Sequence, residues 1–140
     1  MRCTCLFGRK SSSRKGYFGS LIQPNSKYEK HIFICVNERN PDSSRGDCTR
    51  CGGQEIRLEF VRLINQYGLK GKVRANKSGC LDVCELGPTV VIYPGGIWYN
   101  QFSLSDVEEI FKTSVLGNDA VERLRSTNKT WEQLAKLRNQ

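Results

Sequence analysis

The stretch that decides the fold is SGCLDVCELGPTVVIYPGGIWY, residues 78–99 of a 140-residue chain. It holds two cysteines, Cys80 and Cys84, followed by the run TVVIYPGGIWY over residues 89–99. TVVIY is β-branched and aromatic, PGG is typical of a tight turn, and IWY is suited to a returning strand. The stretch therefore predicts a β-hairpin that is directly preceded by a loop with two thiols.

The residues upstream predict a strand, a helix and a second strand. HIFICVN (31–37) is continuously apolar after its first residue, which is typical of a strand buried on both faces. The polar, glycine-containing residues 38–53 predict a long loop. GQEIRLEFVRLINQYG (53–68) places apolar side chains at spacings of three and four, which predicts a helix, and KVRAN (72–76) predicts a short strand.

Downstream of the hairpin, SLSDVEEIFKTSVLG (103–117) has the polar start, early acids and terminal glycine of a second helix. The order strand, helix, strand, hairpin, helix predicts a right-handed β-α-β crossover with an antiparallel hairpin added to the same sheet. We therefore expect an α/β fold, a thioredoxin-like sandwich with a mixed four-stranded sheet covered by both helices.

The chain is long enough for one domain with an extension at each end. We expect the domain over residues 30–116, a basic extension over residues 1–29, and a charged tail over residues 117–140 with a short helix near 129–138. Residues 1–30 carry +6 of the net charge of +8, in a Ser- and Gly-rich segment typical of a disordered, flexible extension. An anionic partner or organelle targeting is left open for it.

Charge and hydropathy argue against several classes of protein. The basic excess lies in the extension, so the domain itself carries no strong signal of nucleic-acid binding. No apolar stretch reaches the roughly 18 to 20 residues needed to cross a bilayer, and the start lacks the apolar segment of a secretory signal. We therefore expect a cytoplasmic protein that binds neither membranes nor nucleic acid.

Seven cysteines are an odd number for a closed set of disulfides, and the cytoplasm disfavours structural disulfides. Five of them end the first predicted strand or lie in the loops before the first helix and the third strand, so we expect these five to gather at one edge of the sheet. About four thiolates enclose an iron–sulfur cluster or a zinc ion. The predicted domain holds Cys35, Cys48, Cys51, Cys80 and Cys84. Cys3 and Cys5, in the extension, are not expected to be ligands.

At these residues the sequence resembles the thioredoxin-like [2Fe-2S] ferredoxins. The resemblance is carried by FICV with Cys35, RGDC with Cys48, SGCLDVC with Cys80 and Cys84, and GPTVVIYPGGIWY, and it covers residues 30 to about 116. In this family one cysteine ends the first strand, a second closes a long loop, and the last two form a C-x3-C pair. The long gap between the first two favours the stand-alone ferredoxins over the related small subunits of NADH dehydrogenases and hydrogenases.

The resemblance implies an electron carrier and not an enzyme. On this basis Cys35 and Cys48 hold one iron of a [2Fe-2S] cluster, and Cys80 and Cys84 hold the other. The cluster cycles by one electron, which the protein exchanges with redox partner proteins by transient docking. A homodimer is left open.

Basic side chains flank the cysteine loops and predict an electrostatic effect. A cluster with four thiolate ligands is negatively charged, so cations near it raise its reduction potential. The candidates are Arg45, Arg50, Arg74 and Lys77. The alternative is that these four are ordinary solvated loop charges.

Cys51 departs from the family pattern, because it forms a CTRC pair with Cys48 where the first helix is predicted to begin. A helix N-terminus stabilises a thiolate, which is the physical basis of disulfide exchange. Cys51 is therefore a free thiol, a substitute ligand or half of a redox dithiol. The alternative functions are a thiol–disulfide oxidoreductase that uses Cys48 and Cys51, and a zinc-stabilised binding module. The sequence leaves open whether the bond before Pro88 is cis.

Overall fold

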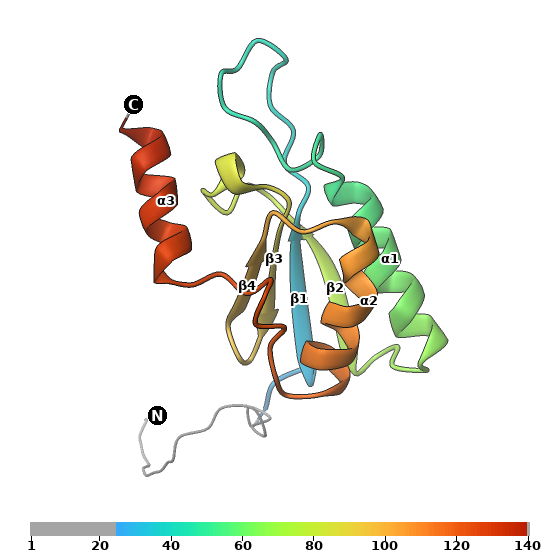
Figure 1. Ribbon diagram of the computed structural model, residues 1–140. Helices are drawn as coiled ribbons and strands as arrows, with labels where there is room; N and C mark the ends of the chain where they lie inside the picture. The colour runs from blue at the N-terminus through green and yellow to red at the C-terminus, as the bar shows by residue number, and fades with distance from the viewer. Residues whose placement is uncertain (1–24, 140) are drawn as a thin grey trace, which may run out of the picture.

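A computed structural model describes residues 25–139, which form an α/β fold around one four-stranded sheet (Figure 1). The strand order is β2-β1-β3-β4. The strands are β1 (Lys30–Cys35), β2 (Val73–Ser78), β3 (Thr89–Tyr93) and β4 (Ile97–Asn100). Residues 1–24 and 140 lie outside the described part of the chain, and with them most of the predicted basic extension, Cys3 and Cys5.

The topology confirms the predicted mixed sheet. β1 and β2 are parallel and are connected through helix α1 (Gly53–Gln66), whereas β3 is antiparallel to both β1 and β4. Cys35 lies opposite Ser78 in the parallel pair. Because the carboxyl ends of parallel strands meet at one edge of a sheet, the loops that follow β1 and β2 leave the sheet side by side. These loops carry the cysteines that the sequence singled out.

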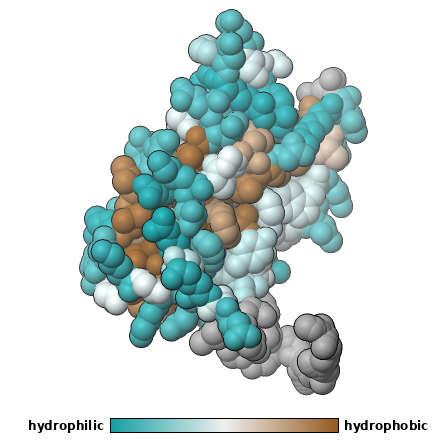
Figure 2. All heavy atoms as spheres, turned by 180° about the vertical axis from the view of Figure 1, so that it is seen from behind, coloured by the Kyte–Doolittle hydropathy of each residue, from teal (hydrophilic) through white to brown (hydrophobic). Residues whose placement is uncertain are grey.

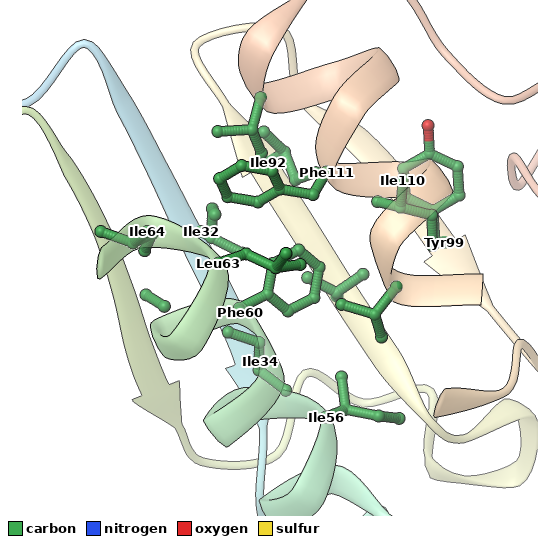
Figure 3. Close-up of a cluster of buried hydrophobic side chains, with 14 of the residues drawn as sticks. Ile32, Ile34, Ile56, Phe60, Leu63, Ile64, Ile92, Tyr99, Ile110 and Phe111 are labelled. Atoms are coloured by element: carbon green, nitrogen blue, oxygen red, sulfur yellow. The ribbon is translucent and has the colours of Figure 1, made fainter. Parts of the chain in front are cut away.

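The hydrophobic core lies between one face of the sheet and helices α1 and α2 (Val107–Ile110), as Figure 3 shows. Apolar side chains at helical spacing on α1 pack against alternate residues of the strands. Burial of each large side chain stabilises the fold by roughly 1.5–3 kcal/mol. The largest fully buried members include Ile32, Ile34, Ile56, Phe60, Leu63, Ile92, Tyr99, Ile110 and Phe111.

The prediction that the first strand is buried on both faces is wrong. Ile32 and Ile34 are fully buried, whereas His31 and Phe33 alternate with them and are only partly buried. The rings of His31 and Phe33 lie 4.2 Å apart, and Tyr93 packs edge-on against Phe33. The apolar run therefore reflects one core face and one aromatic face of the sheet. Figure 2, a view from behind, shows apolar side chains gathered beneath the hydrophilic loop at the top.

The helix predicted over residues 103–117 is present but is composite. It begins with a 3-10 turn, continues as α2, and ends as a π-helical segment, η4 (Phe111–Leu116). A capping box formed by Ser103 and Asp106 starts it. The Tyr99 hydroxyl from β4 lies 2.6 Å from Ser114 Oγ and accepts the Val121 N–H at 2.9 Å, which ties the end of this helix to the sheet.

Helix α3 (Asn128–Arg138) lies apart from α1 and α2, beside the 3-10 turn η2 (Cys84–Leu86) (Figure 1). Its Trp131 packs edge-on against Trp98 of β4, with ring centroids 5.5 Å apart. Its Leu134 packs with apolar residues of the cysteine loop. The C-terminal helix is therefore attached to the segment that carries Cys84.

The peptide bonds Gly87–Pro88 and Tyr93–Pro94 are both cis, which answers the question that the sequence left open at Pro88. Within residues 25–139, no helix combines the length and the apolar character that a membrane span requires.

Candidate metal centre

Five cysteines lie at the edge of the sheet where β1 and β2 end. Cys35 is the last residue of β1, Cys48 and Cys51 lie between β1 and α1, and Cys80 and Cys84 lie between β2 and β3. All five are free thiols. Cys35, Cys48 and Cys84 are buried, whereas Cys51 and Cys80 are exposed. The structure therefore brings the predicted ligands to one end of the molecule, with one of them open to solvent.

The four predicted ligands lie in two pairs. The sulfurs of Cys80 and Cys84 are 3.1 Å apart. Hydrogen bonding by the Cys48 thiol lowers the pKa of Cys35 to about 6, and the backbone N–H groups of Asn37 and Leu81 act in the same direction. The pKa of Cys48 is raised, because its interaction with Cys35 and its burial both favour the neutral thiol. Cys35 is thus the thiol of its pair that is most easily deprotonated.

Backbone contacts hold the two pairs against each other. Leu81, next to Cys80, directs its N–H at the Cys35 sulfur. A Cβ added to Gly87 would lie 3.2 Å from Cys48 Sγ and 3.4 Å from the Cys84 carbonyl oxygen. Gly87 is therefore a place where the backbone after the second pair closes on a thiol of the first pair.

Gly53, at the start of α1, joins the Cys35 and Cys48 segments. Its N–H donates to the Cys48 carbonyl at 2.7 Å. A Cβ at this position would lie 2.4 Å from the Cys35 carbonyl oxygen and 2.8 Å from that of Cys48. Real side chains essentially never make such contacts, so only glycine lets these two segments approach as they do.

Most of the cations that the sequence predicted to lie near the cluster contact carboxylate or amide groups instead of sulfur. Arg45 pairs with Glu85 at 3.0 Å and Arg50 with Asp47 at 3.4 Å. Arg74 donates to the Asn76 side chain at 3.0 Å. The charge-to-sulfur contact expected of these residues is made instead by a cation that sequence reasoning missed.

The missed residue is Arg39, whose Nη2 donates to the sulfurs of both Cys80 and Cys84 at 3.4 Å. These contacts raise the pKa of the guanidinium further above its usual value. Arg39 lies only four positions after Cys35, but it meets sulfurs 41 and 45 positions away in the chain. Its place in a polar loop gave no periodic signal, and only the path of the loop brings it to the thiols.

Cys51 lies close to the site without the properties of an activated dithiol. Its sulfur would lie 3.4 Å from a Cβ at Gly87, so it neighbours Cys48 across this glycine. Burial, together with the negative charge of Asp47, raises the pKa of the Cys51 thiol. The pKa of Cys48 is raised as well. A thiol–disulfide oxidoreductase requires a lowered pKa at the attacking thiol, and neither thiol of the CTRC pair has one.

A charge network fastens α3 to the loop that carries the second thiol pair. Arg138 Nη2 donates to the Asp82 carbonyl at 2.6 Å and to Glu85 Oε1 at 3.0 Å. Arg45 contacts the same Glu85 from the long loop. Hydrogen bonds from Arg138 and then Arg45 lower the pKa of Glu85 to about 2, despite its partial burial. Asp82 and Glu85 thus clamp the loop between α3 and the rest of the site.

These residues fit a binuclear group. Among residues 25–139, no three His, Cys, Asp or Glu side chains meet around one point as a single metal ion would require. The thiols form two pairs instead, and in a [2Fe-2S] cluster each iron takes two cysteine ligands. The buried Nε of Arg39, which points from the same guanidinium that contacts Cys80 and Cys84, has no hydrogen-bond acceptor among the described residues. A sulfur-rich anionic group would supply one.

Comparison with known proteins identifies relatives of this chain. No protein-family model matches the chain. A curated 2Fe-2S ferredoxin of Aquifex aeolicus is 38% identical over 96 residues, which is 68% of this chain and 86% of the relative. A 2Fe-2S ferredoxin of Clostridium pasteurianum is 35% identical over 95 residues, 68% of this chain and 93% of the relative.

A solved structure shares the fold as well as the sequence. The crystal structure of the thioredoxin-like [2Fe-2S] ferredoxin from Aquifex aeolicus matches with a TM-score of 0.67 and 35% identity, over 73% of this chain and 99% of that one. The agreement covers nearly the whole length of that relative. The chain belongs to the thioredoxin-like [2Fe-2S] ferredoxin family.

Proposed function

We propose that this protein is a one-electron carrier that binds a [2Fe-2S] cluster and exchanges electrons with redox partner proteins. The observation that carries the proposal is the arrangement of four cysteines from three segments in two pairs at one edge of the sheet. Cys35 and Cys48 would ligate one iron, and Cys80 and Cys84 the other. Family membership supports the same cofactor.

The described residues can perform the tasks of such a carrier. A bound [2Fe-2S] cluster supplies a one-electron couple. Buried Cys35, Cys48 and Cys84 keep water from most of the site, and the lowered pKa of Cys35 favours the thiolate needed for binding. The carrier makes and breaks no covalent bonds in a substrate, so we infer that it is not an enzyme.

The exposed side of the site is the place for electron exchange. Cys80 is exposed, in contrast to the other three proposed ligands. Electron-transfer partners dock transiently and through small interfaces, so we propose that they contact the surface around Cys80. Because free thiols and thiolate ligands persist under reducing conditions, the cytoplasm is the location that suits this function.

The test is an anaerobic purification followed by iron and sulfide quantitation, visible spectroscopy and electron paramagnetic resonance of the dithionite-reduced protein. We expect about two irons and two sulfides per chain, visible bands that bleach on reduction, and a signal in the reduced state. A colourless protein with stoichiometric zinc would refute the proposal in favour of the zinc-stabilised module. Insulin reduction that needs Cys51 but not Cys35 would favour the oxidoreductase.

A further inference from the structure

Arg39 directs a permanent positive charge at one of the two thiol pairs. Its Nη2 lies 3.4 Å from the sulfurs of both Cys80 and Cys84 and donates to them. The residue belongs to the loop between Cys35 and Cys48, so the contact joins the segment that carries one pair to the segment that carries the other. Hydrogen bonds from a cation to thiolates are among the stronger kinds in proteins.

The backbone around Arg39 is fixed in place by a buried carboxylate. Asp47 is fully buried and accepts the Arg39 N–H at 2.9 Å and the Arg50 N–H at 2.8 Å. The Arg50 side chain in turn donates to the Arg39 carbonyl at 3.0 Å. Both polar groups of the Arg39 backbone are therefore held, which orients the side chain before any ligand binds.

The same guanidinium has one buried donor without a partner among the described residues. Arg39 Nε is buried, and no residue of the described chain accepts its hydrogen bond. A buried donor without an acceptor costs about 1–3 kcal/mol. Arg57 Nε is also buried without a partner among the described residues. The Arg39 guanidinium differs in that it contacts two thiols, where a bound group could accept the hydrogen bond. Arg45 and Arg50, by contrast, pair with carboxylates that offset their charge.

We propose that Arg39 raises the reduction potential of the [2Fe-2S] cluster, by donating from Nη2 to the thiolates of Cys80 and Cys84 and from Nε to a cluster sulfur. This inference rests on the proposed function. Reduction adds one negative charge to the site, and a fixed cation stabilises the reduced form more than the oxidised form. Hydrogen bonds to the sulfurs act in the same direction, because they withdraw charge from the iron.

Redox titrations of three variants test this role. Arg39→Gln removes the charge and the fork of donors, Arg39→Lys keeps the charge but loses the fork, and Arg74→Gln is the control. Arg74 lies on β2, six positions before Cys80, and donates to Asn76. The control removes the same charge without a contact to sulfur. Each variant is first assayed for iron and for its visible spectrum, and its midpoint potential is then measured spectroelectrochemically.

We expect Arg39→Gln to retain the cluster and to lower the equilibrium constant for its reduction about tenfold. For a one-electron couple this corresponds to a midpoint potential that is lower by about 59 mV. Arg39→Lys should lie between Arg39→Gln and the unsubstituted protein, and Arg74→Gln should change the equilibrium less than twofold. If Arg39→Gln fails to assemble a cluster, the test uses Arg39→Lys, and a lowered midpoint potential in that variant supports the inference.

An unchanged potential in a cluster-loaded Arg39→Gln protein would overturn the inference, as would an equal shift in Arg74→Gln. If Arg39→Gln holds no cluster, an unchanged potential in Arg39→Lys has the same meaning. An unsubstituted protein without iron or visible bands would instead contradict the proposed function, so the two failures are distinguishable.

Discussion

At the scale of single residues, the site depends on four thiols with distinct surroundings. Cys35 has its pKa lowered to about 6, chiefly by the Cys48 thiol, whereas burial and neighbouring groups raise the pKa of Cys84. Cys51 is exposed and lies across Gly87 from Cys48. Exposure does not separate Cys51 from the expected ligands, because Cys80 is exposed as well. What separates Cys51 is its place outside both thiol pairs.

The ligand assignment predicts opposite results for serine substitutions at Cys84 and Cys51. Cys84→Ser should lose the cluster or bind it weakly, because serine replaces a buried thiolate of the second pair. Cys51→Ser should retain full iron content, since both pairs remain complete. Iron quantitation and visible absorbance of anaerobically purified variants provide the measurement. Loss of iron in Cys51→Ser alone would reverse the assignment.

Gly53 predicts a second residue-scale effect, which requires no metal to detect. In Gly53→Ala the added methyl would lie 2.4 Å from the Cys35 carbonyl oxygen, so the two cysteine segments must separate. Forced overpacking of this kind costs about 1–3 kcal/mol, measurable as a loss in the free energy of urea unfolding, together with lower iron content. Gly79→Ala is the matched control, because its Cβ meets nothing within 4 Å. Equal behaviour of the two variants would contradict the close-contact argument.

At the scale of elements, the C-terminal parts of the chain are fastened to the site by side chains far apart in sequence. Tyr99 links β4 to η4 and to Val121, and α3 contacts the second cysteine loop through Arg138 and Leu134. Figure 1 shows α3 on its own side of the molecule, next to η2. These contacts make the order of the loop depend on the helix.

Arg138→Ala should release that loop and accelerate iron loss. The variant removes the donors to Asp82 and Glu85, so the segment between Cys80 and Cys84 opens more often. We expect at least a twofold higher rate of iron transfer to an external chelator. Lys136→Ala is the control, because it removes a charge from the same last turn of α3. A rate equal to that of the control would show that α3 does not hold the loop.

Tyr99→Phe tests the hydrogen bonds that attach Ser114 and Val121 to β4. The substitution leaves the buried Val121 N–H without its acceptor and removes one of the two partners of the Ser114 hydroxyl, which still donates to the Asp119 carbonyl. This loss should lower the free energy of unfolding by about 1–3 kcal/mol. Tyr93 is 44% exposed, so Tyr93→Phe should change the free energy of unfolding by less than about 0.5 kcal/mol. Chemical denaturation of both variants measures the difference. Comparable losses in the two would mean that the Tyr99 hydroxyl is not structural.

At the scale of the whole molecule, one edge of the sheet receives the three chain segments that carry the proposed ligands. A bound cluster would cross-link the end of β1, the loop before α1 and the loop after β2. A ligand that binds only the folded state adds its binding free energy to the stability of the fold. The site is therefore expected to contribute to stability as well as to electron transfer.

Removal of the cluster should lower the thermal midpoint of unfolding. We expect a decrease of at least about 5 °C, which corresponds to about 1 kcal/mol for a domain of this size. Anaerobic calorimetry of the loaded protein and of chelator-treated protein, both with reductant, gives the comparison. Identical midpoints would show that the site is preformed and that its ligands add nothing to the stability of the fold.

Local pattern was sufficient for most of the fold. Periodicity predicted α1, and β-branched and aromatic composition with turn chemistry predicted the β3–β4 hairpin. The parallel β1–β2 pair followed from the crossover rule. The aromatic face of β1 was misjudged, because a continuous apolar run does not reveal whether a second layer covers it. The composite character of the helix over residues 103–117 was also missed, since its hydrogen-bond pattern is set partly by contacts with Tyr99 and Lys30.

The sequence by itself determined the order of elements, the edge of the sheet at which the cysteines lie, and the family resemblance, because these depend on residues near one another in the chain. Only the tertiary structure decided which cation faces sulfur, why Gly53 must be glycine, and that α3 clamps the second cysteine loop. Those contacts join residues as many as 56 positions apart. They depend on the paths of loops through space, which no local period encodes.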